Sequence, residues 1–135
     1  VEAAGDEVND ILNCKIAEYS AAILRNKPCF HISLITDVSP NCDCHSENDR
    51  PIIPDVGMLA SFDPVALDMA CADLCLAQPI ISDSVPGEKA AKGEDCEHSH
   101  DVFNYTHPDT NWRSGIEHAV KMGLGNKEYE LITVK

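Results

Sequence analysis

The chain has few positive charges, few aromatic residues and no long apolar run. Ten Lys and Arg residues stand against 23 Asp and Glu residues, which gives a net charge of −13. This excess of acid repels nucleic-acid phosphates and anionic membrane surfaces, so we expect no nucleic-acid or membrane partner and favour cations, metal ions or basic protein surfaces. No apolar stretch reaches the roughly 18 residues of a membrane span. Aromatic residues make up only 5% of the chain, so the core must consist mainly of aliphatic side chains.

Several motifs with known chemistry are also missing. The sequence has no nucleophile elbow, no Gly-rich phosphate loop and no basic stripe, so it gives no support to a serine hydrolase, a nucleotide-binding protein or a nucleic-acid-binding protein. No signal peptide is visible at this N-terminus. The seven cysteines are odd in number, so they cannot all pair within one chain, and we expect a reducing, cytoplasmic location. The chain begins at Val1 rather than Met, and we expect it to be the C-terminal part of a longer protein.

The first half of the chain predicts one helix and two strands. Residues 6–26 carry apolar side chains at helical spacing and predict a surface helix; its apolar stripe consists of Val8, Ile11, Leu12, Ile16, Tyr19 and Ile23. Residues 29–36 form a short, nearly continuous apolar run, which is typical of an interior strand covered on both faces. Residues 56–61 predict a second strand. Residues 37–55, with three prolines, are expected to form a long functional loop between the two strands.

The second half predicts a buried helix and a surface helix. Residues 64–77 are apolar nearly all round, which indicates a buried helix, and Asp63 is its expected N-cap. Residues 82–107 are polar and acidic and predict a second long loop. A last helix is expected to open at Asp109 or Thr110 and to end at Gly123.

The order of these elements predicts the fold class. With a final strand at residues 129–134, helices and strands alternate along the whole chain, which favours an α/β fold. We therefore expect residues 1–135 to form a single three-layer domain, with a short, mainly parallel central sheet and helices on both faces.

The densest group of potential metal ligands is the run Asn41-Cys42-Asp43-Cys44-His45. Thiolate and imidazole suit iron or zinc, but a tetrahedral ion needs four ligands. The remaining ligands would come from elsewhere, with His31, Asp37 and Asp55 or residues after 95 as candidates. The alternative is a solvated loop with two idle or redox-active thiols. Nearby acids are expected to raise the pKa of both thiols, because negative charge disfavours the thiolate.

Other candidate residues are more scattered. Cys96, His98 and His100 share one face of an extended chain and form either a second ligand group or an acidic loop with incidental histidines. His107 is a ligand, an acid/base group or a hydrogen-bonded histidine before a helix. Asp68 lies on the buried helix and either caps a nearby loop or orients His45 or His107.

The run around Cys42, followed by Pro51-Ile-Ile-Pro-Asp-Val-Gly-Met-Leu-Ala-Ser-Phe-Asp-Pro-Val-Ala-Leu-Asp68, resembles the DUF362 family of uncharacterised proteins, often named Fe-S center proteins. The segment from His107 to Arg113 and the later Gly123-Leu-Gly125 resemble the end of that family. Many members carry an upstream ferredoxin-like module with cysteine quartets. No such quartet occurs here, so the resemblance implies a C-terminal part whose iron-sulfur cluster and ferredoxin-like partner domain belong to the parent protein.

Together these observations predict the C-terminal domain of an iron-sulfur-associated, metal-linked redox protein of unknown reaction. The expected metal ligands are Cys42, Cys44, His45, Asp55 and His107, with iron or zinc at the two thiols. One alternative is a non-catalytic docking module whose loops recognise a partner. Another is a zinc-dependent hydrolase in which Asp43 or Asp55 acts as base.

Overall fold

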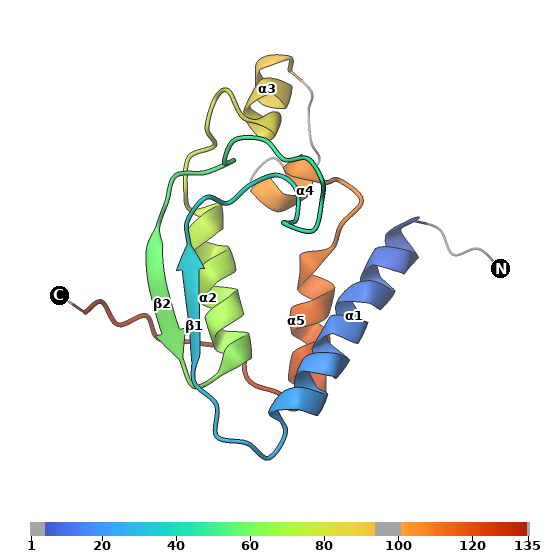
Figure 1. Cartoon of the computed structure of the whole chain (residues 1–135), viewed down its shortest axis with the longest axis vertical. Helices are drawn as coiled ribbons and strands as arrows, with labels where there is room; N and C mark the ends of the chain where they lie inside the picture. Colours follow the sequence, from blue (N-terminus) through green and yellow to red (C-terminus); the bar gives the residue numbers. More distant parts are fainter. Residues whose placement is uncertain (1–4, 94–100, 135) are drawn as a thin grey trace.

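The computed structural model describes residues 5–93 and 101–134, and Figure 1 shows their arrangement. Five helices and two strands follow one another in this part of the chain. They are α1 (Gly5–Leu24), β1 (His31–Ile35), β2 (Gly57–Ser61), α2 (Pro64–Leu76), α3 (Val85–Ala91), α4 (Val102–Thr106) and α5 (Trp112–Lys121). None of the described helices is both long enough and apolar enough to cross a membrane.

The two strands pair antiparallel, with His31 opposite Ser61 and Ile35 opposite Gly57. The predicted mainly parallel central sheet is therefore wrong. A parallel pair needs a crossover, usually a helix, that carries the chain over the sheet. Here residues 36–56 fold back beside the strand they leave, since the Ile52 N–H donates to the Val38 carbonyl and the Val56 N–H donates to that of Ile35. Residues 129–134 form no strand in the described chain.

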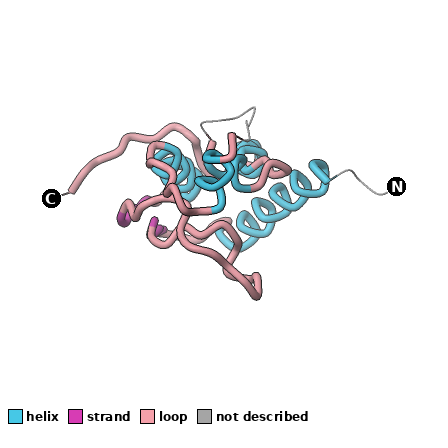
Figure 2. Tube along the Cα trace, turned by 90° about the horizontal axis from the view of Figure 1, so that it is seen from above, coloured by secondary structure: helices cyan, strands magenta, loops and turns pink. Residues whose placement is uncertain are grey.

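Helices cover only one face of this sheet, so the predicted three-layer arrangement is also wrong. α2 packs behind both strands, and Figure 2 shows the strands to one side of the helices. On the outer face Ile32, Leu34 and Met58 are 59%, 68% and 69% exposed. The apolar run at 29–36 predicted a strand buried on both faces, but in the described structure α2 covers the inner face and the outer face is exposed.

The buried helix predicted at 64–77 is confirmed as α2. Asp63 caps it by accepting hydrogen bonds from the Val65 and Ala66 N–H groups at 2.9 and 3.0 Å, and Pro64 occupies the first turn. One side of α2 joins a core with β1 and the loop, made of Ile35, Ile52, Ile53, Cys75 and Val102. The other side joins a smaller core made of Ala17, Val65 and Ala119.

α1 packs against α5 through small residues. Ala17 and Ala21 are buried, and a Cβ added at Gly115 would lie 3.5 Å from atoms of Asn13. The apolar stripe noted in the sequence lies on the other side of α1 and is exposed. Its members, from Val8 to Ile23, are each more than half accessible to solvent. The helix is therefore as predicted, but its large apolar side chains do not contribute to the described core.

The segment 82–107, expected to be a loop, contains α3 and α4, while residues 94–100 lie outside the described residues. Asp101 caps α4 through the N–H groups of Phe103 and Asn104. The same carboxylate accepts hydrogen bonds from Trp112 Nε1 at 3.0 Å and from Arg113 at 2.6 Å. One buried acid thus joins the start of α4 to the start of α5.

Candidate functional site

The loop that carries Cys42 and Cys44 is held by its own polar contacts. The Asn48 side chain accepts a hydrogen bond from the Asn41 N–H and donates to the Asn41 carbonyl and to Ser39. At the base of the loop, Asp55 accepts a hydrogen bond from the Asp37 N–H at 2.9 Å. Pro40 and the neighbouring Ile52 are buried. Hydrogen bonds therefore hold this loop in place at its tip and at its base, and its two thiols are exposed to solvent.

The two thiols interact directly with each other. Hydrogen bonds from the Cys44 backbone and thiol lower the pKa of Cys42, while the hydrogen bond with Cys42 and the negative charge of that residue raise the pKa of Cys44. The sequence-based expectation that acids raise both values is wrong for Cys42, because local hydrogen bonding outweighs the charge of Asp43. The opposite shifts make Cys42 the easier of the two exposed thiols to ionise.

The other predicted ligands surround this loop without converging on the thiols. The His45 N–H donates to the Cys42 carbonyl at 2.9 Å, which closes a turn. Asp55 is engaged at the base of the loop. His107, the C-cap of α4, places its Nε2 2.5 Å from the Pro40 carbonyl oxygen and so ties α4 to the loop.

Within residues 5–93 and 101–134, no three His, Cys, Asp or Glu residues are grouped as a metal site requires. The second predicted group, Cys96, His98 and His100, lies outside the described residues. The described part of the chain therefore offers two adjacent thiols as donors. Any further ligands to the same ion have to come from water, from a partner or from residues beyond this part.

A second cluster lies between β1 and α2. His31 and Ser33 project from the inner face of β1, and Asp68 and Cys71 project from the facing side of α2. The Cys71 thiol and the Ser33 side chain are hydrogen-bonded, and burial raises the pKa of Cys71. Burial also raises the pKa of Asp68, although the nearby His31 opposes this effect. Among the described residues, His31 Nε2 is buried and has no hydrogen-bond partner.

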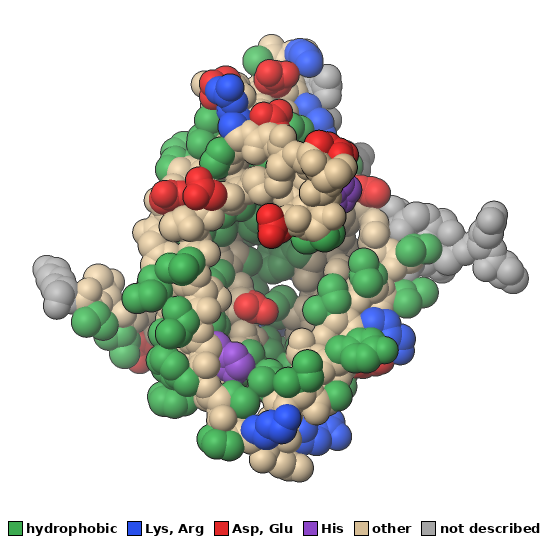
Figure 3. Space-filling view, in the orientation of Figure 1, with side chains coloured by type: hydrophobic (Ala, Val, Ile, Leu, Met, Phe, Trp, Pro, Cys, Tyr) green, Lys and Arg blue, Asp and Glu red, His purple; other side chains and the backbone are tan. Residues whose placement is uncertain are grey.

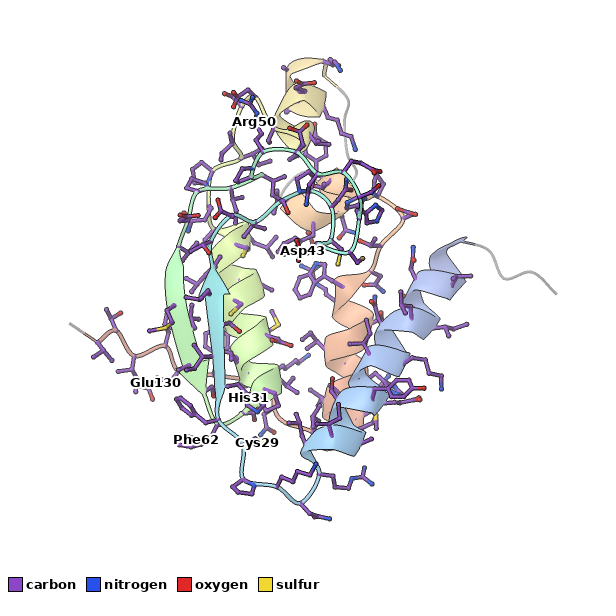
Figure 4. The ribbon with its side chains drawn as sticks, viewed as in Figure 1. Cys29, His31, Asp43, Arg50, Phe62 and Glu130 are labelled. Carbon is purple, nitrogen blue, oxygen red and sulfur yellow. The ribbon has the colours of Figure 1, made fainter. Side chains whose placement is uncertain are left out.

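This cluster borders a cavity of about 760 Å³ between β1, α1, α2 and α5. Figure 3 shows the cavity as a hollow in which an acidic and a histidine side chain are visible; Asp68 and His31 are the acidic and histidine residues that line it. Asp68 reaches solvent through the hollow, but the surrounding walls still desolvate its carboxylate. In Figure 4, His31 lies near the start of β1 and Asp43 lies in the thiol loop beyond the other end of that strand.

Sequence reasoning treated His31 as a spare ligand for the thiol loop and Asp68 as a cap or as an orienting acid for His45 or His107. The structure instead places His31 and Asp68 beside each other. The sequence does indicate that His31 and Ser33 share one face of the strand, because alternate residues of a strand point the same way. It also indicates that Asp68 and Cys71 share one face of the helix, because they are about one turn apart. No local pattern in the sequence indicates that this face of β1 packs against this face of α2. Cys75 is buried in the core and Cys71 packs against it, as expected.

Comparison with known proteins gives one family and no individual relative. No curated protein and no solved structure matches the chain. The model of a family described as "Domain of unknown function (DUF362)" matches residues 2–73, which include β1, β2, the thiol loop and the part of α2 that carries Asp68. The chain therefore belongs to the DUF362 family.

Proposed function

We propose that this protein is the C-terminal domain of an iron-sulfur-associated, metal-linked redox protein, and that Cys42 and Cys44 provide thiolates to an iron or zinc ion. The observation that carries this proposal is that two exposed thiols lie on one loop, close enough for each to shift the pKa of the other. Two sulfurs bound to one tetrahedral ion at about 2.3 Å lie roughly 3.8 Å apart. Two neighbouring thiols on one loop are suited to share such an ion.

The electrostatics of the loop support a cation at this place. Metal binding requires deprotonated sulfur, and the hydrogen bonds from Cys44 make Cys42 the easier thiol to ionise. A bound cation would then favour loss of the second proton from Cys44. Asp43 and Glu47 on the same loop add negative charge that attracts a cation. When bound, an ion would supply redox or Lewis-acid chemistry, and the chain would hold it through the two thiolates.

Metal content tests the proposal. The protein is purified anaerobically without chelator, and iron, zinc and sulfide are measured in the native protein and in a Cys42→Ser/Cys44→Ser variant. We expect the native protein to contain metal and the double variant to lose it. Cys42 and Cys44 are exposed and belong to neither hydrophobic core, so the variant should unfold at the same urea concentration as the native protein.

A matched variant removes two thiols elsewhere. Cys14 and Cys29 are partly buried and are not part of the loop, so Cys14→Ser/Cys29→Ser should keep the full metal content. Retention of metal by the loop variant would refute the assignment of the site. Iron or sulfide in the native protein would support the redox function, whereas stoichiometric zinc would support a zinc hydrolase. A metal-free native protein would leave a docking role.

A non-catalytic docking module is a second candidate, favoured by the exposed apolar stripe of α1. Six large apolar residues of this stripe are between 51% and 72% exposed. The outer face of the sheet adds Ile32, Leu34 and Met58, and beside it the rings of Phe30 and Phe62 lie 4.9 Å apart with both side chains exposed. Apolar surface of this extent in a single chain is typical of a protein-binding site.

A further inference from the structure

β1 has one edge that no strand pairs with in the described chain. The sheet contains β1 and β2 alone, so the side of β1 away from β2 presents unpaired backbone N–H and C=O groups. The far edge of β2 is also unpaired among the described residues, and residues 129–134 line a separate cavity beside it. A two-stranded sheet is marginally stable by itself, and a third strand would normally complete it. The free edge of β1, which borders the larger of these two cavities, is the place that we consider for that strand.

The cavity described above runs along this edge. Four consecutive residues of β1 and its entry, from Phe30 to Ser33, form one wall, and residues of α1 form the opposite wall. A strand of five residues occupies a slot about 17 Å long, 4.8 Å wide and 10 Å deep, which is roughly 800 Å³. The cavity volume is about 760 Å³. The groove thus has the size of one strand laid beside β1.

Two polar groups in the groove lack the partners that such a strand could supply. His31 Nε2 is buried and unpaired within the described chain. Asp68 has a pKa raised by burial and makes no side-chain hydrogen bond among the described residues. The remaining lining is mainly apolar, with Ile16, Val65 and Ile116 among its residues. The groove therefore combines an apolar floor with one carboxylate and one imidazole.

We propose that the groove between β1 and α1 binds an extended segment of another polypeptide as a third, edge-paired strand, with apolar side chains at alternate positions and one Lys or Arg against Asp68. This inference rests on the docking role and not on the thiol loop. Backbone hydrogen bonds to β1 would provide affinity, and the inward side chains would provide specificity. The cation would pair with the desolvated carboxylate, and the net charge of −13 would attract a basic segment.

The geometry favours a single strand over a second copy of this chain. A second copy would bring its β1 together with the attached β2 and α2. The groove is closed on its far side by α1 and has the volume of one strand, so a whole sheet does not fit beside β1. A free, flexible segment can enter it from the open face seen in Figure 3.

The test uses a synthetic peptide of the proposed pattern, acetyl-Thr-Val-Thr-Lys-Thr-Val-Thr-amide. Binding is measured by calorimetry and by amide hydrogen exchange on the whole protein. We expect saturable binding that slows exchange of the β1 amides not bonded to β2. Replacing the central Lys of the peptide by Glu should weaken binding about tenfold, because two carboxylates would then meet in the groove. Replacing both the fifth and sixth residues by Pro should abolish binding, because N–H groups of adjacent residues point to opposite edges of a strand and one of the two lost groups must belong to the ladder with β1.

Variants of the protein locate the site. Ser20 lines the groove from α1, so Ser20→Trp should fill it and prevent binding. Ala22→Trp, on an exposed part of the same helix outside the groove, is the matched control and should bind normally. Asp68→Asn should remove the preference for Lys over Glu. Cys42→Ser/Cys44→Ser should bind like the native protein, which separates this result from that of the metal experiment.

Three outcomes would overturn the proposal. The first is no slowing of β1 exchange at millimolar peptide. The second is equal binding of the Pro-containing peptide, which would indicate apolar adsorption without strand pairing. The third is concentration-dependent dimerisation that protects the same amides without peptide, which would make the occupant a second copy of this chain.

Discussion

Replacing Asp101 by Ala should destabilise the protein by about 2 kcal/mol, because this carboxylate makes three kinds of contact. Its cap on α4 contributes about 1 kcal/mol, through N–H groups at 3.1 and 3.2 Å. Its bond from Trp112 Nε1 contributes about 1 kcal/mol. The ion pair with Arg113 adds no more than about 0.5 kcal/mol, since the Arg113 side chain is half exposed and solvent screens it.

Urea unfolding of matched variants would check this magnitude. Asn at position 101 keeps the oxygen that caps α4 but replaces the oxygen that accepts from Trp112 and Arg113 by an NH2 donor, so Asp101→Asn should lose about half as much stability as Asp101→Ala. Asp83→Ala removes an exposed ion pair with Arg50 and should change stability by less than about 0.5 kcal/mol. Equal losses in Asp101→Ala and Asp83→Ala would refute the assignment of Asp101 as the joint between α4 and α5.

The same residue predicts a pH dependence with a definite sign. Burial acts to raise the pKa of Asp101, but hydrogen bonds from Arg113, Trp112 and the Asn104 backbone outweigh it, so the pKa is lowered. A lowered pKa in the folded state means that the contribution is fully present above the unfolded value near 4 and is lost as the pH falls through the folded value. The stability difference between the native protein and Asp101→Ala should therefore shrink in strong acid. A difference that grows in acid would contradict this account.

Three further predictions concern other parts of the structure. Gly87→Ala should cost about 2 kcal/mol in urea unfolding, because the new Cβ would lie 2.2 Å from the Ile81 carbonyl oxygen, a backbone atom; an unchanged midpoint would show that α3 adjusts freely. Asp68→Asn should raise thermal stability slightly at neutral pH, by less than about 1 kcal/mol after solvent screening, because the raised pKa of Asp68 means that ionisation of this residue disfavours the folded state. The gain should vanish below about pH 4, where Asp68 is protonated in both states. A loss of stability at neutral pH would contradict this reasoning. Iodoacetamide should modify Cys42 at a lower pH than Cys44, because their pKa values shift in opposite directions; peptide mass spectrometry would reveal the reverse order if the hydrogen bond is misassigned.

Local sequence signals predicted α1, α2 and α5, missed α3 and α4, and predicted the sheet poorly. Asp63 and Pro64 marked the start of α2, and its apolar composition indicated burial correctly. The end of α5 followed from Gly123, whose φ of +70° suits glycine, although the helix begins at Trp112 rather than at Asp109 or Thr110. Helix caps and helical periodicity involve residues only a few positions apart, so they can be recognised in a single sequence.

Strand pairing depends on contacts that no local pattern specifies. The apolar run around β1 was correctly assigned to a strand, but the direction of its partner follows from how residues 36–56 fold back through the Val38 and Ile35 carbonyls. The same limit explains why the proximity of His31 and Asp68 was missed, since the two residues are far apart in sequence. Asp101 was missed for a related reason, because its partners lie on the next helix.

The mismatch between pattern and packing is itself informative. The sequence places large apolar residues along one side of α1 and on both faces of β1, as a chain does when those surfaces are to be buried. In the described structure the small residues Ala17 and Ala21 make the contact with α5, and the large ones remain exposed. Leaving so much aliphatic surface in water forgoes about 25 cal/mol for every Å². The free edge of β1 and the unpaired His31 Nε2 border the cavity that Ile16 and Ile23 of the α1 stripe also line. A partner strand in the groove would satisfy the backbone edge and the polar groups, and the polypeptide that carries it would be placed to cover α1 and the outer face of the sheet.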